Sequence, residues 1–319
     1  MKRLSGKENL IMKKKILIPV DTSDHSLKAV QYVATFFSPK QTEIVLYHVY
    51  SQLEDFFSSL DISPDPAKYE MTDLLKSHQN LIDTFMHKAR SVLQDAGFLE
   101  SDITVKIKVQ SLPGIALEIL NESKNSYHAI AVGRTGISQL NEYMGNTASS
   151  LASKVHHIPL IVVDSVPAIN NILIAYDGSE SADRAVDCVA DLLTDTTYNV
   201  LLYHVIKAFR YSLIGIIQIL PSQKIEKQYN EKLSGEIQAK LDKVTDRFVT
   251  KGIGKGQLSR SIDTGVKSRA KAVLDKSKKD GFDTIVVGRR GHRLMDIDIG
   301  TVGRKIVNFA IDKTVWIVN

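Results

Sequence analysis

The chain has 319 residues, which suits two domains better than one, and its 43% hydrophobic and 24% charged residues are typical of a globular protein. The net charge of +5 is modest, and the basic residues form only short runs such as 13–15, without the basic and aromatic stripe of a nucleic-acid-binding protein. The single cysteine, Cys188, excludes an intramolecular disulfide and suits a reducing compartment.

Two apolar segments are candidates for a signal peptide or a membrane span, and neither fits. The start, MKRLSGKENLIMKKKILIPV, is basic, but its apolar part is too short and too broken for a signal peptide. The segment LIGIIQIL (213–220) is well short of the roughly 20 residues that span a bilayer, and we expect a buried or subunit-facing helix there. We therefore expect a cytoplasmic protein with no membrane span and no nucleic-acid partner.

The N-terminal half alternates short apolar runs with helical patterns. The strand ILIPV is followed by a helical pattern, and the strand EIVLYHVY (43–50) by a long helix whose apolar residues recur between Met71 and Leu93. A strand near 103–109, a helix near 115–123 and a strand at 129–132 come next. A loop with two glycines, a last helix and a last strand complete the pattern.

The same succession returns in the C-terminal half. KKILIPVDTSDHSLKAV returns as NNILIAYDGSESADRAV, which places Asp177 156 residues after Asp21, and EIVLYHVY returns as NVLLYHVI at the same offset. The glycine loop VGRTGISQLNEYMGNT returns as VGRRGHRLMDIDIGT at an offset of 155. Matching segments in the same order indicate two copies of one domain, at 13–164 and 170–319, which pack closely because the join DSVPAIN is short.

The first helix of the second copy has two distinct sides. Its apolar positions are Ala182, Ala185, Val186, Val189, Ala190 and Leu193. Its opposite side carries Asp183, Arg184, Asp187 and Asp191. This spacing is typical of an amphipathic helix packed on a sheet.

Alternation of strands and helices predicts a doubly wound parallel sheet with right-handed crossovers in each copy. Ligands of such sheets lie beyond the carboxyl ends of the strands. Asp21 and Asp177 end the first strands, and Gly133 and Gly288 end the fourth strands. We therefore expect the aspartate and the glycine of each copy to share one crevice.

The residues at this crevice suit a nucleotide. Glycines let the backbone approach an anion closely, and Gly300 with Thr301 opens a helix whose free N–H groups and dipole favour negative charge. An acid at the end of the first strand suits the hydroxyls of a ribose. The combination predicts nucleotide binding.

These segments resemble the universal stress protein family in tandem form: ILIPVDTSDHSLKAV, ILIAYDGSESADRAV, the two YHV strand ends and the two VGR-x-G loops. The resemblance covers nearly the whole chain. It implies a five-stranded, adenine nucleotide alpha-hydrolase-like sheet in each copy and packing of the copies as a pseudo-dimer, with a homodimer of the chain left open. The family's ATP-binding branch carries G-x2-G-x9-G-(S/T) and binds ATP, with or without magnesium, without a metal-dependent hydrolytic apparatus.

The resemblance places one candidate nucleotide site in each copy, and the second copy matches the motif better. There Asp177 would meet the ribose and Val205 the adenine, and the residues around the phosphates would be Gly288, Arg289, Gly291, Gly300, Thr301 and Val302. The corresponding residues of the first copy are Asp21, Val49, Gly133, Gly136, Gly145, Asn146 and Thr147.

Both copies depart from the family motif. Eight residues, not nine, precede the third glycine, and Asn146 stands where the motif has a hydroxyl. The second loop contains Asp296 and Asp298. These carboxylates would repel phosphates unless they face solvent, pair with arginines of the same loop, or share a magnesium ion.

Other candidate residues have structural interpretations. His48 and His204 occupy matching strands, and we expect hydrogen-bonded core residues because no Cys or His lies at metal-ligand spacing. No nucleophile, base and orienting group form a set, so the sequence predicts no enzyme and no catalytic residue.

We therefore expect a stress-response regulatory protein that binds ATP or a related adenine nucleotide, with the second copy favoured. Two alternatives stay open. One is a nucleotide-free interaction module whose shortened loops have lost the site. The other is slow ATP hydrolysis, which would need Asp296 or Asp298 to hold magnesium.

Overall fold

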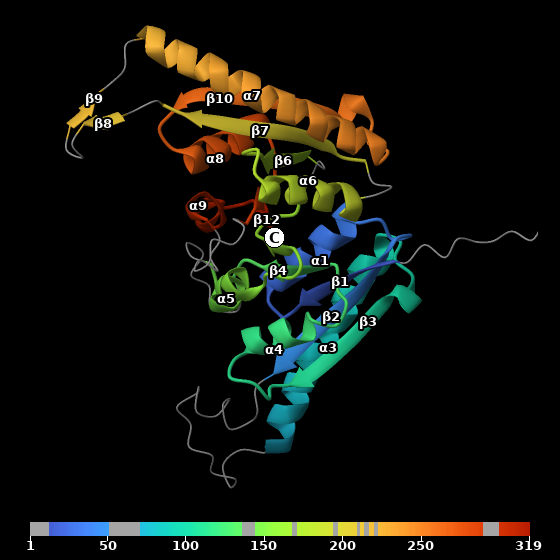
Figure 1. Ribbon diagram of the computed structural model, residues 1–319. Helices are drawn as coiled ribbons and strands as arrows, with labels where there is room; N and C mark the ends of the chain where they lie inside the picture. The colour runs from blue at the N-terminus through green and yellow to red at the C-terminus, as the bar shows by residue number, and fades with distance from the viewer. Residues whose placement is uncertain are drawn as a thin grey trace, which may run out of the picture.

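The computed structural model describes residues 13–50, 71–135, 144–167, 171–193, 197–208, 211–213, 217–219, 223–289 and 300–319 (Figure 1). In the N-terminal copy the strands are β1 (Lys14–Pro19), β2 (Thr42–Tyr50), β3 (Ile103–Val109), β4 (Ala129–Gly133) and β5 (Leu160–Val163), and the helices are α1 (Asp24–Phe36), α3 (Met71–Asp95), α4 (Ile115–Glu122) and α5 (Asn146–Lys154).

The C-terminal copy repeats these elements. Its strands are β6 (Asn171–Ala175), β7 (Asn199–Lys207), β10 (Leu258–Val266), β11 (Thr284–Gly288) and β12 (Thr314–Val318), and its helices are α6 (Glu180–Leu192), α7 (Gln223–Thr250), α8 (Arg269–Asp280) and α9 (Thr301–Phe309). Most of the elements expected from the sequence are present with nearly the expected bounds.

The two copies form one continuous ten-stranded sheet with the order β10-β7-β6-β11-β12-β5-β4-β1-β2-β3. Within each copy all neighbouring strands are parallel, whereas β5 and β12 pair antiparallel at the centre. The expected pair of five-stranded doubly wound sheets, packed as a pseudo-dimer, is confirmed. The strand order reverses beside β1 and beside β6, so a ligand crevice is expected there in each copy.

Each strand divides its side chains between two cores. In β1, Ile16 and Ile18 belong to the core under α1, α3, α6 and α7, and Leu17 belongs to the core under α4, α5, α8 and α9. Successive strand residues point to opposite faces, and both faces are covered by helices (Figure 1). This explains why the strands are continuous apolar runs rather than alternating ones.

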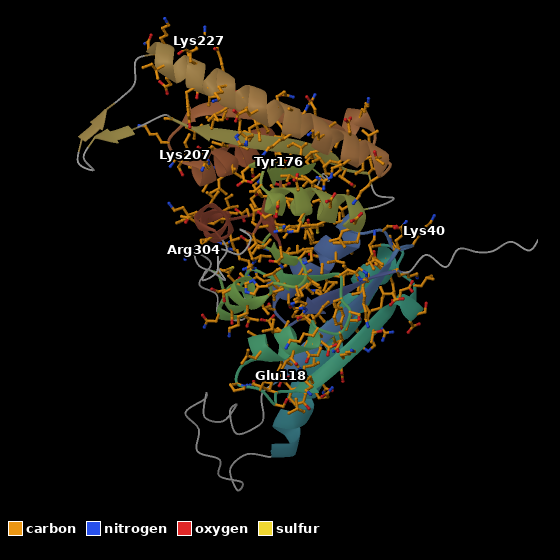
Figure 2. The ribbon with its side chains drawn as sticks, viewed as in Figure 1. Lys40, Glu118, Tyr176, Lys207, Lys227 and Arg304 are labelled. Atoms are coloured by element: carbon orange, nitrogen blue, oxygen red, sulfur yellow. The ribbon has the colours of Figure 1, made fainter. Side chains whose placement is uncertain are left out.

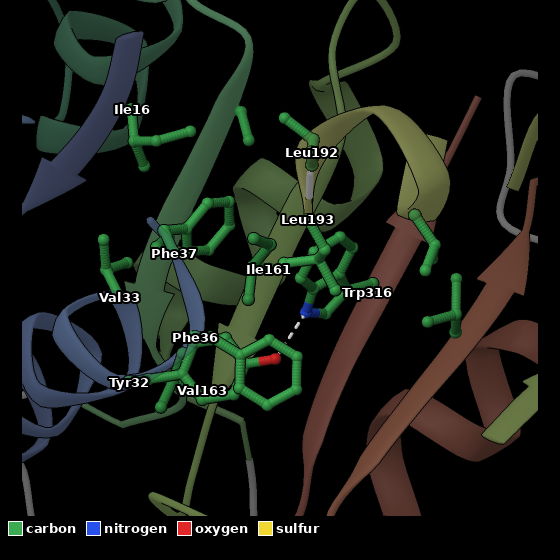
Figure 3. Packing of buried hydrophobic residues seen from close by; sticks show 14 of the residues in the cluster. Ile16, Tyr32, Val33, Phe36, Phe37, Ile161, Val163, Leu192, Leu193 and Trp316 are labelled. Atoms are coloured by element: carbon green, nitrogen blue, oxygen red, sulfur yellow. Dashed lines mark hydrogen bonds between the residues drawn. The ribbon is translucent and has the colours of Figure 1, made fainter. Parts of the chain in front are cut away.

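The cores of the two copies merge where β5 meets β12. Trp316, which is fully buried, donates a hydrogen bond from Nε1 to Tyr32 Oη over 2.8 Å, and Tyr32 Oη lies 3.1 Å from Thr284 Oγ1 (Figure 3). Phe37 of the N-terminal copy stacks on Trp316 with ring centroids 5.8 Å apart. The copies therefore share one interior and form one body.

The apolar segment 213–220 is not a helix in its described part. β8 (Tyr211–Leu213) and β9 (Ile217–Ile219) pair antiparallel as a separate two-stranded sheet, so the expectation of a helix was wrong. Ile217 and Ile219 are β-branched, which favours a strand over a helix. Within the described residues, no helix is long and apolar enough to cross a membrane.

Candidate functional site

An open cavity lies beyond the carboxyl ends of β6, β7 and β11 in the C-terminal copy. Its volume is about 90 Å³. The strand ends and the first turns of α6, α8 and α9 line it. The predicted residues that the structure brings together here are Asp177, Val205, Gly288, Gly300 and Val302.

The N-terminal copy has a matching cavity of about 280 Å³ beyond β1, β2 and β4. The predicted residues that line it are Asp21, Val49, Gly133, Gly145, Asn146 and Thr147. The predicted residues Gly136 and Gly291, and the loop residues Asp296 and Asp298, lie outside the described residues.

The strand-end aspartates are held by the same turn in both copies. Asp21 Oδ1 accepts a hydrogen bond from Ser23 Oγ over 2.5 Å, and Asp177 Oδ1 accepts one from Ser179 Oγ over 2.5 Å. Each serine also caps the following helix, because its Oγ accepts the N–H of the residue three positions later. The turn fixes one carboxylate oxygen and leaves Oδ2 for a ligand at the cavity.

The first glycine of each loop is needed for packing. A Cβ atom at Gly133 would lie 2.6 Å from the carbonyl oxygen of His25, and one at Gly288 would lie 2.5 Å from the carbonyl oxygen of Ser181. Both distances are far below van der Waals contact. The start of α1 or α6 therefore rests directly on the strand end, a role that differs from the close approach to an anion that we inferred from sequence.

The third glycine opens the helix that points at the cavity. Gly145 precedes α5 and Gly300 precedes α9, and neither helix start has a side-chain cap. The first N–H groups of a helix have no carbonyl partner within it and attract negative charge. Asn146 and Thr147 line the N-terminal cavity, whereas Thr301 is exposed at the first turn of α9 and does not line its cavity.

Arg289 lies elsewhere than the resemblance implied. Its side chain is only 5% exposed, and Nη2 donates to the carbonyl oxygen of Ala152, in α5 of the other copy, over 2.6 Å. Arg134 makes the reciprocal contact, because its Nη1 and Nη2 donate to Val307 and Asn308 of α9 over 2.7 and 2.6 Å. The expectation of Arg289 beside the phosphates is therefore corrected: these arginines cap helix ends across the two copies.

The mouths of the two cavities differ. Arg269, exposed at the first turn of α8, lines the C-terminal cavity, and its Nε donates to the Val205 carbonyl oxygen over 3.3 Å. At the corresponding first position of α4, Ile115 lines the N-terminal cavity. Glu118, buried in α4 (Figure 2), accepts the N–H of Leu112 over 2.6 Å and so holds the loop that leads to Ile115.

The matching histidines are both hydrogen-bonded, as the sequence predicted, but only His48 is a buried core residue, because His204 is part-buried and lines the C-terminal cavity. Nδ1 of His48 and of His204 each donates to a backbone carbonyl oxygen, of Val20 and Tyr176, over 2.8 Å. Burial lowers the pKa of His204, against a smaller opposing effect of the Tyr176 carbonyl. No group of three metal-ligating side chains is present among the described residues.

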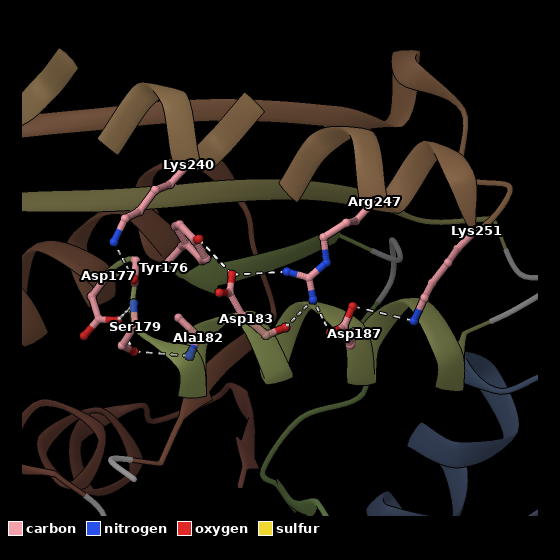
Figure 4. Close-up of polar contacts among 10 residues, drawn as sticks. Tyr176, Asp177, Ser179, Ala182, Asp183, Asp187, Lys240, Arg247 and Lys251 are labelled. Carbon is pink, nitrogen blue, oxygen red and sulfur yellow. Dashed lines mark hydrogen bonds and ion pairs between the residues drawn. The ribbon is translucent and has the colours of Figure 1, made fainter. Parts of the chain in front are cut away.

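In the C-terminal copy, ion pairs hold α7 against α6 (Figure 4). Arg247 pairs with Asp183 over 3.3 Å and with Asp187, and Lys251 pairs with Asp187 over 3.6 Å. Lys240 donates to the Gly178 carbonyl oxygen over 2.8 Å, directly after the strand-end aspartate. The charged side of α6 predicted from sequence thus faces a partner helix.

The fold and the two cavities define a tandem α/β protein of the nucleotide alpha-hydrolase-like class. The chain belongs to the universal stress protein family, whose model matches residues 12–164 and again 168–319. It matches none of the curated proteins with which it was compared.

Two solved structures that match nearly the whole chain have the same fold. A universal stress protein from Archaeoglobus fulgidus DSM 4304 is 20% identical, with 95% of this chain and 97% of that chain covered and a TM-score of 0.57. The protein PA1789 from Pseudomonas aeruginosa PAO1, described as functionally unknown, is 14% identical, with 96% and 92% covered and a TM-score of 0.54. A universal stress protein in complex with cAMP is 19% identical, with 47% of this chain and 96% of that chain covered and a TM-score of 0.34.

Proposed function

We propose that this member of the universal stress protein family is a regulatory protein that binds ATP or a related adenine nucleotide beyond the carboxyl ends of the sheet strands. The observation that carries the proposal is the convergence of Asp177, Gly288 and Gly300 on one open cavity, with the uncapped start of α9 at its edge. The carboxylate suits ribose hydroxyls, and the free helical N–H groups suit phosphates.

The residues present fit such a ligand without catalytic chemistry. The described part of the cavity offers backbone N–H groups, one carboxylate, the guanidinium of Arg269, the hydroxyl of Ser181 and the imidazole of His204. Ser181 Oγ lies 3.0 Å from Ser179 Oγ and His204 Nδ1 donates to the Tyr176 carbonyl oxygen, so neither pairs with the other as nucleophile and base. The nucleotide would then act as a bound effector. It would change the surface that the protein presents to a partner.

The test begins with nucleotide that copurifies with the protein. Freshly purified protein is denatured, and released adenine nucleotide per chain is quantified by anion-exchange chromatography. Gly300→Asp is the informative variant, because aspartate is a good N-cap that keeps α9 intact while its charge repels a phosphate. Gly256→Asp is the matched control, since Gly256 has open space around it and lies away from both cavities.

We expect nucleotide in the wild type and in Gly256→Asp, and less in Gly300→Asp. If no nucleotide is released and dialysis against radiolabelled ATP shows no binding, the proposal is wrong. The nucleotide-free interaction module would then be favoured, and the glycine loops would be retained without a role in ligand binding.

A further inference from the structure

The hydroxyl of Thr135 is buried at the N-terminal cavity without a hydrogen-bond partner. Thr135 is 5% exposed and lines this cavity, and no partner is found for its Oγ1. Two fully buried threonines use their hydroxyls: Thr284 bonds to Tyr32, and Thr314 donates to the carbonyl oxygen of Ser165. Buried polar groups are nearly always paired, so an unpaired one at a cavity indicates a missing ligand.

Thr135 stands next to the start of α5. The N–H of Gly145 donates to the carbonyl oxygen of Arg134 over 2.8 Å, which closes the loop and brings the following residue, Thr135, to the helix start. The first helical bond of α5 runs from the N–H of Ser149 to Gly145, so the N–H groups of residues 146–148 have no carbonyl partner within the helix. Residues 146–148 line the same cavity.

Two residues near Thr135, Arg134 and Asn146, offer no hydroxyl to a ligand at the start of α5. The guanidinium of Arg134 is committed to the carbonyl groups of α9, on the far side of the interface. Asn146 occupies the position where the C-terminal copy has Thr301. Arg134 Nε has no hydrogen-bond partner but lies 3.7 Å from the Asp164 carboxylate, so of residues 133–135 the Thr135 hydroxyl is the side-chain donor with neither a hydrogen bond nor an ion pair.

We propose that the N-terminal copy binds a phosphate group of a nucleotide at the start of α5, and that Thr135 Oγ1 donates a hydrogen bond to one of its oxygens. Asn146 has no hydroxyl, and Thr135 then supplies one beside that of Thr147, which lines the same cavity. The ligand class rests on the proposed function, while the placement of the phosphate rests on the unpaired hydroxyl and the uncapped helix. Asp21, fixed by Ser23 at the end of β1, is left for the ribose end of the ligand.

The proposal predicts opposite changes in stability and affinity. In the free protein, Thr135→Val removes an unpaired buried hydroxyl and keeps the side-chain shape, so the unfolding midpoint should stay the same or rise. In the complex, the same change removes a hydrogen bond to a charged oxygen and should weaken binding about 10- to 100-fold. Thr314→Val removes a satisfied hydrogen bond and should lower the midpoint without weakening binding.

The experiment uses the full chain with Gly300→Asp, which silences the C-terminal cavity. Equilibrium dialysis with radiolabelled ATP gives the affinity, and thermal unfolding without ATP gives the stability. Thr135→Val and Thr135→Ser are compared in this background. We expect one ATP per chain, a loss of at least 10-fold in Thr135→Val, and near-normal binding in Thr135→Ser.

Each other outcome overturns the inference in a distinct way. If Thr135→Val binds ATP within threefold of its parent, or loses stability together with affinity, the hydroxyl has no ligand role while the proposed function stands. If the Gly300→Asp protein binds no ATP although the wild type does, only the C-terminal copy is a site. If the wild type binds none, the proposed function falls as well.

Discussion

The free energy of unfolding should depend strongly on the buried guanidinium of Arg134, which joins the two copies. It is 1% exposed, donates to two carbonyl oxygens at the end of α9 and lies 3.7 Å from Asp164. Arg134→Met keeps most of the apolar stem and removes the charge. The change leaves the α9 carbonyl groups unpaired and deprives a nearly buried carboxylate of its cation.

The expected cost follows from these contacts. Hydrogen bonds to a charged group contribute about 1.5–3 kcal/mol each, and removing one partner of a buried ion pair costs about 3–5 kcal/mol. The contributions overlap because one side chain makes them all, so we expect Arg134→Met to lower the free energy of unfolding by about 3–5 kcal/mol. Arg184→Met is the control, because that exposed arginine lies 4.0 Å from Glu180 and should cost less than about 1 kcal/mol.

Urea unfolding followed by tryptophan fluorescence measures this difference. Trp316 is the one tryptophan of the chain and is fully buried between the copies, so its emission reports on the interface that Arg134 braces. An Arg134→Met protein within about 0.5 kcal/mol of the wild type, the usual range for surface substitutions, would refute the reasoning.

Three further changes test other parts of the structure. Gly288→Ala should lower the free energy of unfolding by about 1–3 kcal/mol in the same urea assay, because its Cβ would meet the Ser181 carbonyl, whereas Gly256→Ala should not. Arg247→Met should cost about 1 kcal/mol, since its side chain is 38% exposed, and the difference should vanish in 1 M NaCl; a cost independent of salt would contradict ion pairing. Because burial lowers the pKa of His204, the unfolded chain takes up its proton first, so stability should fall as the pH drops below 6.5. His204→Asn should reduce that slope, and an unchanged slope would exclude His204 as its source.

Much of the fold could be predicted from the sequence because its signals are local or repeat at a fixed offset. The run ILIPV reads as a strand covered on both faces, and the return of the aspartate segment after 156 residues reveals the second copy. Ligands of open parallel sheets lie beyond the carboxyl ends of the strands, and this rule predicts from sequence that Asp21 and Gly133 share one crevice. The cavity in each copy agrees with that placement.

The features that sequence reasoning missed depend on contacts between distant segments. Arg289 follows Gly288 directly and was expected beside the phosphates, but the antiparallel pairing of β5 and β12 brings it, like Arg134, within reach of a helix end in the other copy. The sequence shows that α6 has a charged side but not that Asp183 and Asp187 on that side pair with Arg247 of α7. For Thr135, only burial and the lack of a partner mark the hydroxyl, and neither is visible in a sequence.

The presence of the first glycine of each loop does not show whether that copy still binds a nucleotide. Gly133 and Gly288 are required by the packing of α1 and α6 on the strand ends, whether or not a ligand binds. The informative residues are those that packing does not require. Thr135 leaves a buried hydroxyl unpaired, which disfavours the free folded state, and Arg269 places an exposed cation at the mouth of one cavity where Ile115 stands at the other. Because these groups differ between the copies while the surrounding frame is shared, the two sites should differ in affinity and in the number of phosphates that they favour.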